Sequence, residues 1–245
     1  MKAFDPDPSI RWLFCMTHPD DEISVCAWIR RLRDAGSEVF INWTHSTEIR
    51  RAEGRVVGAK LGIIDSSLSF MDAPDGGVCD HLVEYLPQFQ ELMQKVNPDR
   101  VVCGAFEQGH LDHDSTNWLV NHSYTGPVFE APFYHPYSRR LQRMNVFAVP
   151  DGQESLPLSP EEWRLKLEIA KAYPSQNIWT VLWWHEAWQS VRLRPAELRK
   201  RELLRLQVHR DFKTPNLPEP LRTEVIQCAQ WKRWLAAVER ANMPP

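Results

Sequence analysis

Short apolar runs alternate with amphipathic segments along the first half of the chain. Four runs have the length and hydrophobicity of buried strands. They span residues 10–17, 38–44, 67–71 and 100–105. Segments with apolar side chains at helical spacing lie at 21–35, 47–61, 80–97 and near 113–122, and two more strands are predicted at 127–134 and 143–149. This alternation predicts an α/β fold: a doubly wound, mainly parallel, Rossmann-like sheet with helices on both faces.

Local signals mark the ends of these helices. Gly36 and Gly62 each follow the last apolar position of a helical segment, which is a usual place for a glycine cap. Pro87 lies inside the 80–97 segment. Because proline lacks an N–H, we expect Pro87 to kink or split that helix.

The pattern changes from residue 159 onward. Ser159-Pro160-Glu161-Glu162 combines a capping box with proline at the first helical position and therefore predicts a helix, although the apolar positions that follow alternate as in a strand. After Ser175 we expect three more helical segments, with the Arg- and Lys-rich residues 192–213 forming a solvated helix face. We therefore expect a single domain, with a core over about 8–176 and a mostly helical, Trp-rich extension over about 177–245.

Composition narrows the class of protein. The 245 residues carry a formal net charge of -3, which gives no reason to expect nucleic acid or an anionic membrane as a partner. The N-terminus does not resemble a signal peptide, and no run is long enough to span a bilayer. Five cysteines without a CxxC pair favour a reducing, cytoplasmic setting, with Cys15 and Cys103 as small core residues.

The first candidate site is His18-Pro19-Asp20-Asp21-Glu22, directly after the first predicted strand. Histidine and carboxylate are usual ligands of catalytic zinc, and ligands bind beyond the carboxyl ends of parallel strands. The start of a helix also favours anionic aspartates. The alternative is an ordinary loop with a capping aspartate.

The second candidate site, His110-Leu111-Asp112-His113-Asp114, follows the fourth strand. The two clusters can face each other if their strands are neighbours in the sheet. His18, Asp21 and His113 would then supply the three protein ligands of an open zinc site, leaving Asp20 and His110 for acid–base chemistry. The alternative is a turn with surface histidines.

These residues resemble the PIG-L/LmbE-like N-acetylglucosaminyl deacetylases. The first cluster matches their HPDDE signature, and His110-Leu111-Asp112-His113 matches their H-x-D-H signature. Between and after these lie further matching segments, in the same order as in the family. They are Arg50-x-x-Glu53, Leu61-Gly62, Ala73-Pro74-Asp75-Gly76 and Lys171-Ala172-Tyr173-Pro174-Ser175-Gln176. The resemblance covers roughly residues 10–176.

The resemblance implies a Rossmann-like fold and a role for each matching residue. It implies one Zn²⁺ per chain on His18, Asp21 and His113. It makes Asp20 the general base and His110 the group that stabilises the oxyanion and donates a proton. It also implies that Asp112 orients a neighbouring imidazole.

Three further residues are expected to bind substrate, namely Arg50, Asp75 and Gln108. Arg50 is positioned by the matching segment to reach substrate hydroxyls or to pair with Asp75. Gln108 stands where many family members carry tyrosine, and an amide can donate a hydrogen bond but cannot act as a phenolic acid. Trp183-Trp184-His185-Glu186 could stack on a sugar, although a helix packed on the sheet edge or a subunit contact is the favoured interpretation.

The expected reaction is hydrolysis of an N-acyl amide, most simply an N-acetyl group on a small amino sugar, which yields acetate and a free amine. Two other classes stay open. One is a sugar-nucleotide enzyme with a divalent ion, although no G-x-G-x-x-G follows the first strand. The other is a non-catalytic, metal-stabilised binding protein. The Trp-rich C-terminal part is also compatible with a homo-oligomer.

Overall fold

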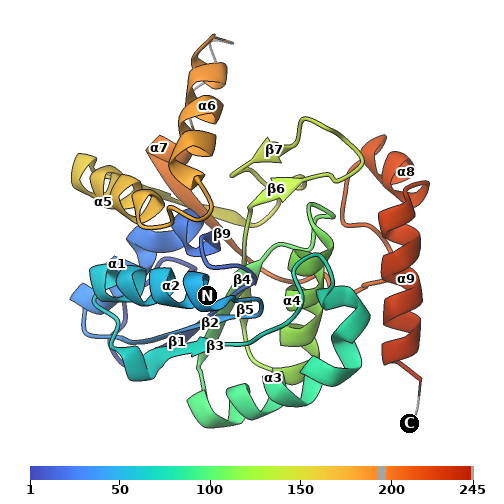
Figure 1. The fold of residues 1–245 in the computed structure, drawn as a ribbon, viewed down its shortest axis with the longest axis horizontal. Helices are drawn as coiled ribbons and strands as arrows, with labels where there is room; N and C mark the ends of the chain where they lie inside the picture. Colours follow the sequence, from blue (N-terminus) through green and yellow to red (C-terminus); the bar gives the residue numbers. More distant parts are fainter. Residues whose placement is uncertain (192–196, 244–245) are drawn as a thin grey trace.

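The computed structural model describes residues 1–191 and 197–243. A seven-stranded sheet runs through the molecule in the order β3-β2-β1-β4-β5-β9-β8 (Figure 1). Its strands are β1 (Arg11–Met16), β2 (Glu38–Trp43), β3 (Leu68–Phe70), β4 (Arg100–Gly104), β5 (Val128–Ala131), β8 (Gln153–Pro157) and β9 (Arg201–Leu206). The strands β3, β2, β1, β4 and β5 pair in parallel, whereas β9 is antiparallel to both β5 and β8. The predicted α/β fold with a mainly parallel sheet is therefore confirmed.

Helices cover both faces of this sheet. They are α1 (Cys26–Asp34), α2 (Glu48–Leu61), α3 (Leu82–Val96), α4 (Leu111–Ser123), α5 (Pro160–Lys171), α6 (Ile178–Val191), α7 (Glu197–Lys200), α8 (Leu221–Ile226) and α9 (Ala229–Ala241). Short 3-10 turns at Asp21–Val25, Asp65–Ser67 and Val78–His81 precede α1, β3 and α3. None of the helices in the described ranges is long and apolar enough to cross a membrane.

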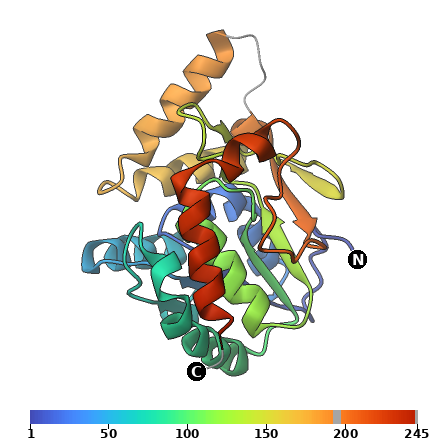
Figure 2. The same cartoon turned by 90° about the vertical axis from the view of Figure 1, so that its right-hand side faces the viewer.

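The side chains of β1 show how the sheet separates two cores. Trp12, Phe14 and Met16 point to one face and pack with α1, α2 and α5, whereas Leu13 and Cys15 point to the other and pack with α3, α4 and α9. Period-two alternation in a buried strand produces this division. In Figure 2, α9 lies against this second layer of helices.

Several predicted boundaries need correction. Pro87 lies within one continuous helix, α3, so the helix is not split. The strand predicted over 127–134 divides into β5 and a separate strand, β6 (Tyr134–His135), which pairs with β7 (Arg143–Met144) in a two-stranded ribbon. The strand predicted over 143–149 is confined to β7, and the strand β8 has no counterpart among the predicted elements.

The largest correction concerns residues 201–206, because the solvated helix face expected over 192–213 is wrong there. Of that range, residues 192–196 lie outside the described residues and residues 197–200 form the helix α7. Residues 201–206 form β9, which inserts between β5 and β8. Two of its charged side chains, Glu202 and Arg205, are buried rather than solvated. Glu202 lies 3.0 Å from Lys166 Nζ with both side chains fully buried, and Arg205 donates to Glu130 across 2.6 Å. These partners compensate the buried charges and so allow the segment to form a strand between β5 and β8.

The remaining C-terminal elements are helical, as expected. The capping box at Ser159 and Glu162 is present, with Pro160 at the start of α5. Helix α6 extends away from the sheet in both views and exposes Trp183, Trp184 and Trp188 (Figures 1 and 2).

Candidate metal-dependent active site

The ends of β1 and β4 bring the two sequence clusters together. These strands are hydrogen-bonded neighbours, with Cys15 opposite Cys103, so the chain leaves both at the same edge of the sheet. A cavity of about 320 Å³ lies there. Its polar lining is His18, Asp20, Asp21, Arg50, Asp75, His110, Ser24, Asn145 and Gln176, and its apolar and aromatic lining is Ile23, Phe133, Tyr134, Met144, Ile178 and Leu198. The cavity therefore has a charged floor beside an apolar wall.

His18, Asp21 and His113 form a set that could hold a metal ion. One ligand atom from each lies within 4.8 Å of the other two, and His113 Nε2 is 3.3 Å from Asp21 Oδ1. The Nε2 atoms of His18 and His113 are buried without a hydrogen-bond partner in the described structure. Buried nitrogens of this kind are costly unless something binds them, and imidazole with carboxylate suits zinc. The residues present therefore fit a divalent ion.

The backbone around Asp20 is strained in a way that shapes the site. Asp20 has φ 131° and ψ -22°, outside the regions that non-glycine residues normally adopt, and the 3-10 turn begins directly after it. Asp21 Oδ2 accepts the backbone N–H groups of Thr17 and His18 at 3.0 and 2.8 Å. Strain of about 1–3 kcal/mol is typical of functional sites. Here it turns Asp20 into the cavity while Asp21 stays fixed to the end of β1.

The two aspartates have opposite protonation tendencies. Burial would raise the pKa of Asp21, but the neighbouring His113 and His18 outweigh burial and hold the pKa well below its usual range. Burial and the negative charge of Asp21 raise the pKa of Asp20 well above its usual value, against the pull of Arg50, whose Nη2 lies 3.5 Å from Asp20 Oδ2. Asp20 is therefore the carboxylate better suited to accept a proton.

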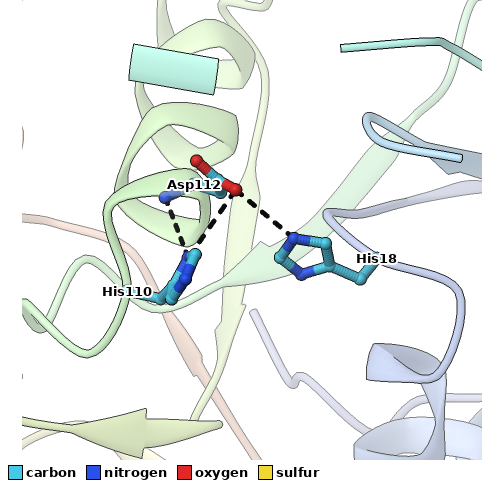
Figure 3. A group of neighbouring side chains, drawn as sticks. All are labelled: His18, His110 and Asp112. Atoms are coloured by element: carbon cyan, nitrogen blue, oxygen red, sulfur yellow. Dashed lines mark hydrogen bonds and ion pairs between the residues drawn. The ribbon is translucent and has the colours of Figure 1, made fainter. Parts of the chain in front are cut away.

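Asp112 connects the two clusters, as Figure 3 shows. Its carboxylate accepts backbone N–H groups from Gly76 at 2.6 Å and Val78 at 3.1 Å, and its Oδ2 lies 3.4 Å from His18 Nε2. Burial alone would lower the pKa of His18, but Asp112 and then Asp75 outweigh it and raise the pKa to about 10. The Asp112 carboxylate is thus held by two backbone N–H groups and lies against the His18 imidazole.

His110 caps helix α4 and keeps one nitrogen free for the cavity. Its Nδ1 accepts the backbone N–H of Asp112 at 3.2 Å, which leaves the proton of a neutral ring on Nε2. Burial and then the charge of His113 lower the pKa of His110 to about 4. His110 is therefore a neutral hydrogen-bond donor near pH 7.

Arg50 and Asp75 lie together at the cavity, as the sequence suggested. Arg50 is almost buried, and its Nη1 is 4.0 Å from Asp75 Oδ2, while Asp75 is largely exposed. Gln108 lies elsewhere. It is fully buried with φ 52°, its side-chain amide has no partner in the described structure, and it is not part of the cavity lining.

Some functional side chains escaped the sequence analysis. His45 has its Nε2 3.9 Å from Asp75 Oδ2, and Tyr134 lies on the cavity wall with its ring centroid 5.1 Å from that of His113. Neither residue lies in a recognisable motif.

Two glutamates in the matching segments have structural partners. Glu22 accepts hydrogen bonds from Tyr173 Oη at 2.6 Å and Trp43 Nε1 at 3.1 Å. Glu53 accepts from both the backbone N–H and the hydroxyl of Ser175. Both pairs link segments that match the family pattern. The ordered set of motifs was therefore the signal that could have revealed these contacts.

Residues 13–124 match the sequence model of the PIG-L family, described as GlcNAc-PI de-N-acetylase. This match covers both signature clusters. The chain carries a PIG-L family region. No sequence among the curated proteins matches the chain.

Solved structures of PIG-L/LmbE-like deacetylases share the fold. A deacetylase of the teicoplanin biosynthesis pathway is 17% identical, with a TM-score of 0.61 and coverage of 82% of this chain and 99% of its own. The N,N'-diacetylchitobiose deacetylase from Pyrococcus horikoshii is 18% identical, with a TM-score of 0.57 and coverage of 83% and 87%. The teicoplanin deacetylase has also been solved in a zinc-inhibited form, at 16% identity, with a TM-score of 0.59 and coverage of 82% and 99%.

Proposed function

We propose that the chain is a zinc-dependent N-deacetylase that removes an acetyl group from the nitrogen of a small amino-sugar derivative. The observation that supports this most strongly is the pair of buried, unpartnered imidazole nitrogens of His18 and His113. They lie beside Asp21, with the proton-accepting carboxylate of Asp20 on the same cavity. A purely structural metal site would not need such an unligated base.

His18, Asp21 and His113 would hold the ion. A bound divalent ion would lower the pKa of water and polarise the amide carbonyl. Asp20 Oδ would take the proton of the attacking water as its oxygen bonds to the carbonyl carbon. His110 Nε2–H would donate a hydrogen bond to the developing oxyanion. The proton held by Asp20 would then pass to the leaving nitrogen, so that a neutral amine departs.

The substrate class follows from the neighbours and the cavity together. Names of the similar proteins refer to N,N'-diacetylchitobiose and to teicoplanin, both in connection with deacetylation. The buried guanidinium of Arg50 and the carboxylate of Asp75 suit sugar hydroxyls, and the apolar wall suits a substituent beyond the sugar. We also propose a reducing, cytoplasmic setting, because all five cysteines are free thiols.

The first experiment is elemental analysis of the purified protein combined with acetate release from a panel of N-acetylated amino sugars. We expect about one zinc per chain in the wild type and its loss in Asp21→Asn and His113→Ala. Asp20→Asn is the matched control, because it should keep the metal and lose about 10²- to 10⁴-fold in turnover.

The alternatives give different results. A wild type that takes up no metal from zinc, iron or cobalt solutions would refute the proposed site. Stoichiometric metal without turnover on any member of the panel would favour a non-catalytic, metal-stabilised binding protein. Metal-dependent binding of a sugar nucleotide would favour a sugar-nucleotide enzyme. Iron and cobalt belong in the measurement because a similar deacetylase has a zinc-inhibited form.

A further inference from the structure

We propose that Tyr134 is a catalytic residue that donates a hydrogen bond from its phenolic hydroxyl to the oxyanion formed on the amide carbonyl. This inference rests on the proposed deacetylase function and goes beyond it, because Tyr134 belongs to none of the matching motifs. The role requires a donor on the cavity wall, a free hydroxyl and a fixed backbone.

Tyr134 meets the requirement of position. It lines the same cavity as Asp20 and His110, and its ring packs against His113 with a centroid separation of 5.1 Å. Among the residues that line the cavity it is the only phenol, and its hydroxyl forms no hydrogen bond with any residue of the described ranges. Burial raises the pKa of the Tyr134 phenol well above its usual value, so the hydroxyl stays protonated at neutral pH and can donate.

The backbone of Tyr134 is held against the loop that carries His110. β6 pairs with β7 through Tyr134 and Met144. The carbonyl oxygen of Tyr134 lies so close to Gly109 that a Cβ at Gly109 would be 1.6 Å from it. Only glycine permits this approach, which fixes the ribbon directly beside the residue that precedes His110.

Additional bonds attach the same ribbon to the same loop. Tyr137 donates its backbone N–H to the Gln108 carbonyl at 2.6 Å, and Gln142 Nε2 donates to the Gly109 carbonyl at 2.8 Å. Tyr134 and His110 are therefore held by one rigid unit. Preorganised donors of this kind stabilise charge that develops during reaction without having to reorganise.

Gln108 cannot supply this hydrogen bond in the observed conformation. It is fully buried and does not line the cavity, and its backbone N–H is bound to Asp114 Oδ1 at 3.2 Å. In the proposed step, the water oxygen bonds to the carbonyl carbon and Asp20 receives the water proton. Tyr134 keeps its own proton and only shares it with the oxyanion.

The test compares Tyr134→Phe with Tyr137→Phe in the zinc-loaded protein, on the amino sugar that the wild type cleaves fastest. Tyr137 is the matched control because it lies in the same segment, but its hydroxyl is buried and does not line the cavity. We expect Tyr134→Phe to lower kcat about 100-fold with KM and zinc content unchanged. Tyr137→Phe should keep kcat within about twofold of the wild type, because it removes no donor from the cavity.

A binding measurement separates a catalytic role from a structural one. Calorimetry with a methylphosphonamidate analogue of the same amino sugar, whose tetrahedral oxygens mimic the oxyanion, should show weaker binding to Tyr134→Phe by a factor similar to the loss in kcat. Unchanged kcat and analogue affinity would overturn the role of Tyr134, as would a rise in KM at constant kcat. If the zinc-loaded wild type released no acetate from any substrate, the proposed function itself would fail, and the role of Tyr134 with it.

Discussion

Replacing Gly109 by alanine tests whether the contact between the β6–β7 ribbon and the His110 loop exists in solution. The added Cβ would lie 1.6 Å from the carbonyl oxygen of Tyr134, whereas such contacts essentially never fall below 3.0 Å. One of the two backbones must therefore move by about 1.4 Å. The obstacle is backbone rather than the tip of a flexible side chain, so the site cannot absorb the change by a rotamer shift.

The expected consequences follow from this displacement. A misplacement of about 1 Å near reacting groups typically costs on the order of 100-fold in rate, so we expect at least that loss in kcat for Gly109→Ala. Overpacking should also cost about 1–3 kcal/mol of unfolding free energy, measured by urea denaturation. Zinc content should stay near that of the wild type, because His18 and Asp21 lie at the end of β1 and His113 lies within helix α4, beyond the moved loop.

Gly58→Ala provides the control, because its Cβ would meet the flexible end of Leu68 at 2.7 Å and neither residue lines the cavity. That variant should keep the turnover of the wild type. If Gly109→Ala retained turnover within about threefold and was no less stable than Gly58→Ala, the close approach of Tyr134 to Gly109 would be wrong.

Two further predictions concern buried ionisable groups. Lys166→Met should lower the unfolding free energy by about 3–5 kcal/mol, because it leaves the fully buried Glu202 without its counter-charge. The double variant with Glu202→Gln should recover part of that loss. Equal stabilities of the wild type and Lys166→Met in urea would contradict the pairing. Burial, followed by two nearby arginines, lowers the pKa of the buried His135 to about 4. Because the unfolded chain keeps a pKa near 6.5, stability should fall as pH drops from about 6.5 toward 4, by about 2 kcal/mol at pH 5. His135→Gln should flatten the dependence of stability on pH, whereas His81→Gln, which replaces a partly exposed histidine, should not. Parallel curves of stability against pH for the wild type and both variants would rule the explanation out.

The sequence by itself determined the elements whose signals are local. The strands β1, β2, β3 and β4 are short apolar runs, and the helices between them follow from apolar positions at helical spacing. Gly62 caps α2 with φ 77°, as its position implied, because a left-handed residue is needed there. The capping box of α5 depends only on Ser159 and Glu162, which lie three residues apart.

The candidate metal site was also accessible from sequence, for a topological reason. His18 and Asp21 follow one buried strand and His113 follows another, and neighbouring parallel strands end at the same edge of a sheet. The motifs of the PIG-L family then indicated which of these polar residues to expect as ligands of one metal ion. Nothing local could have shown that Asp20 is strained or that His110 is neutral, because both properties depend on burial and on the charges of the facing cluster.

Only the tertiary structure decided the role of the segments without a local signal. Residues 201–206 are rich in charge, and their sequence favoured a helix, yet Lys166 and Glu130 neutralise Glu202 and Arg205 and so permit a strand between β5 and β8. Tyr134 reaches the cavity because a glycine 25 positions earlier in the chain leaves room for its carbonyl. Pairing of distant charges and close contact between distant backbones are not encoded in the spacing of neighbouring residues, and for that reason they appear only in the folded chain.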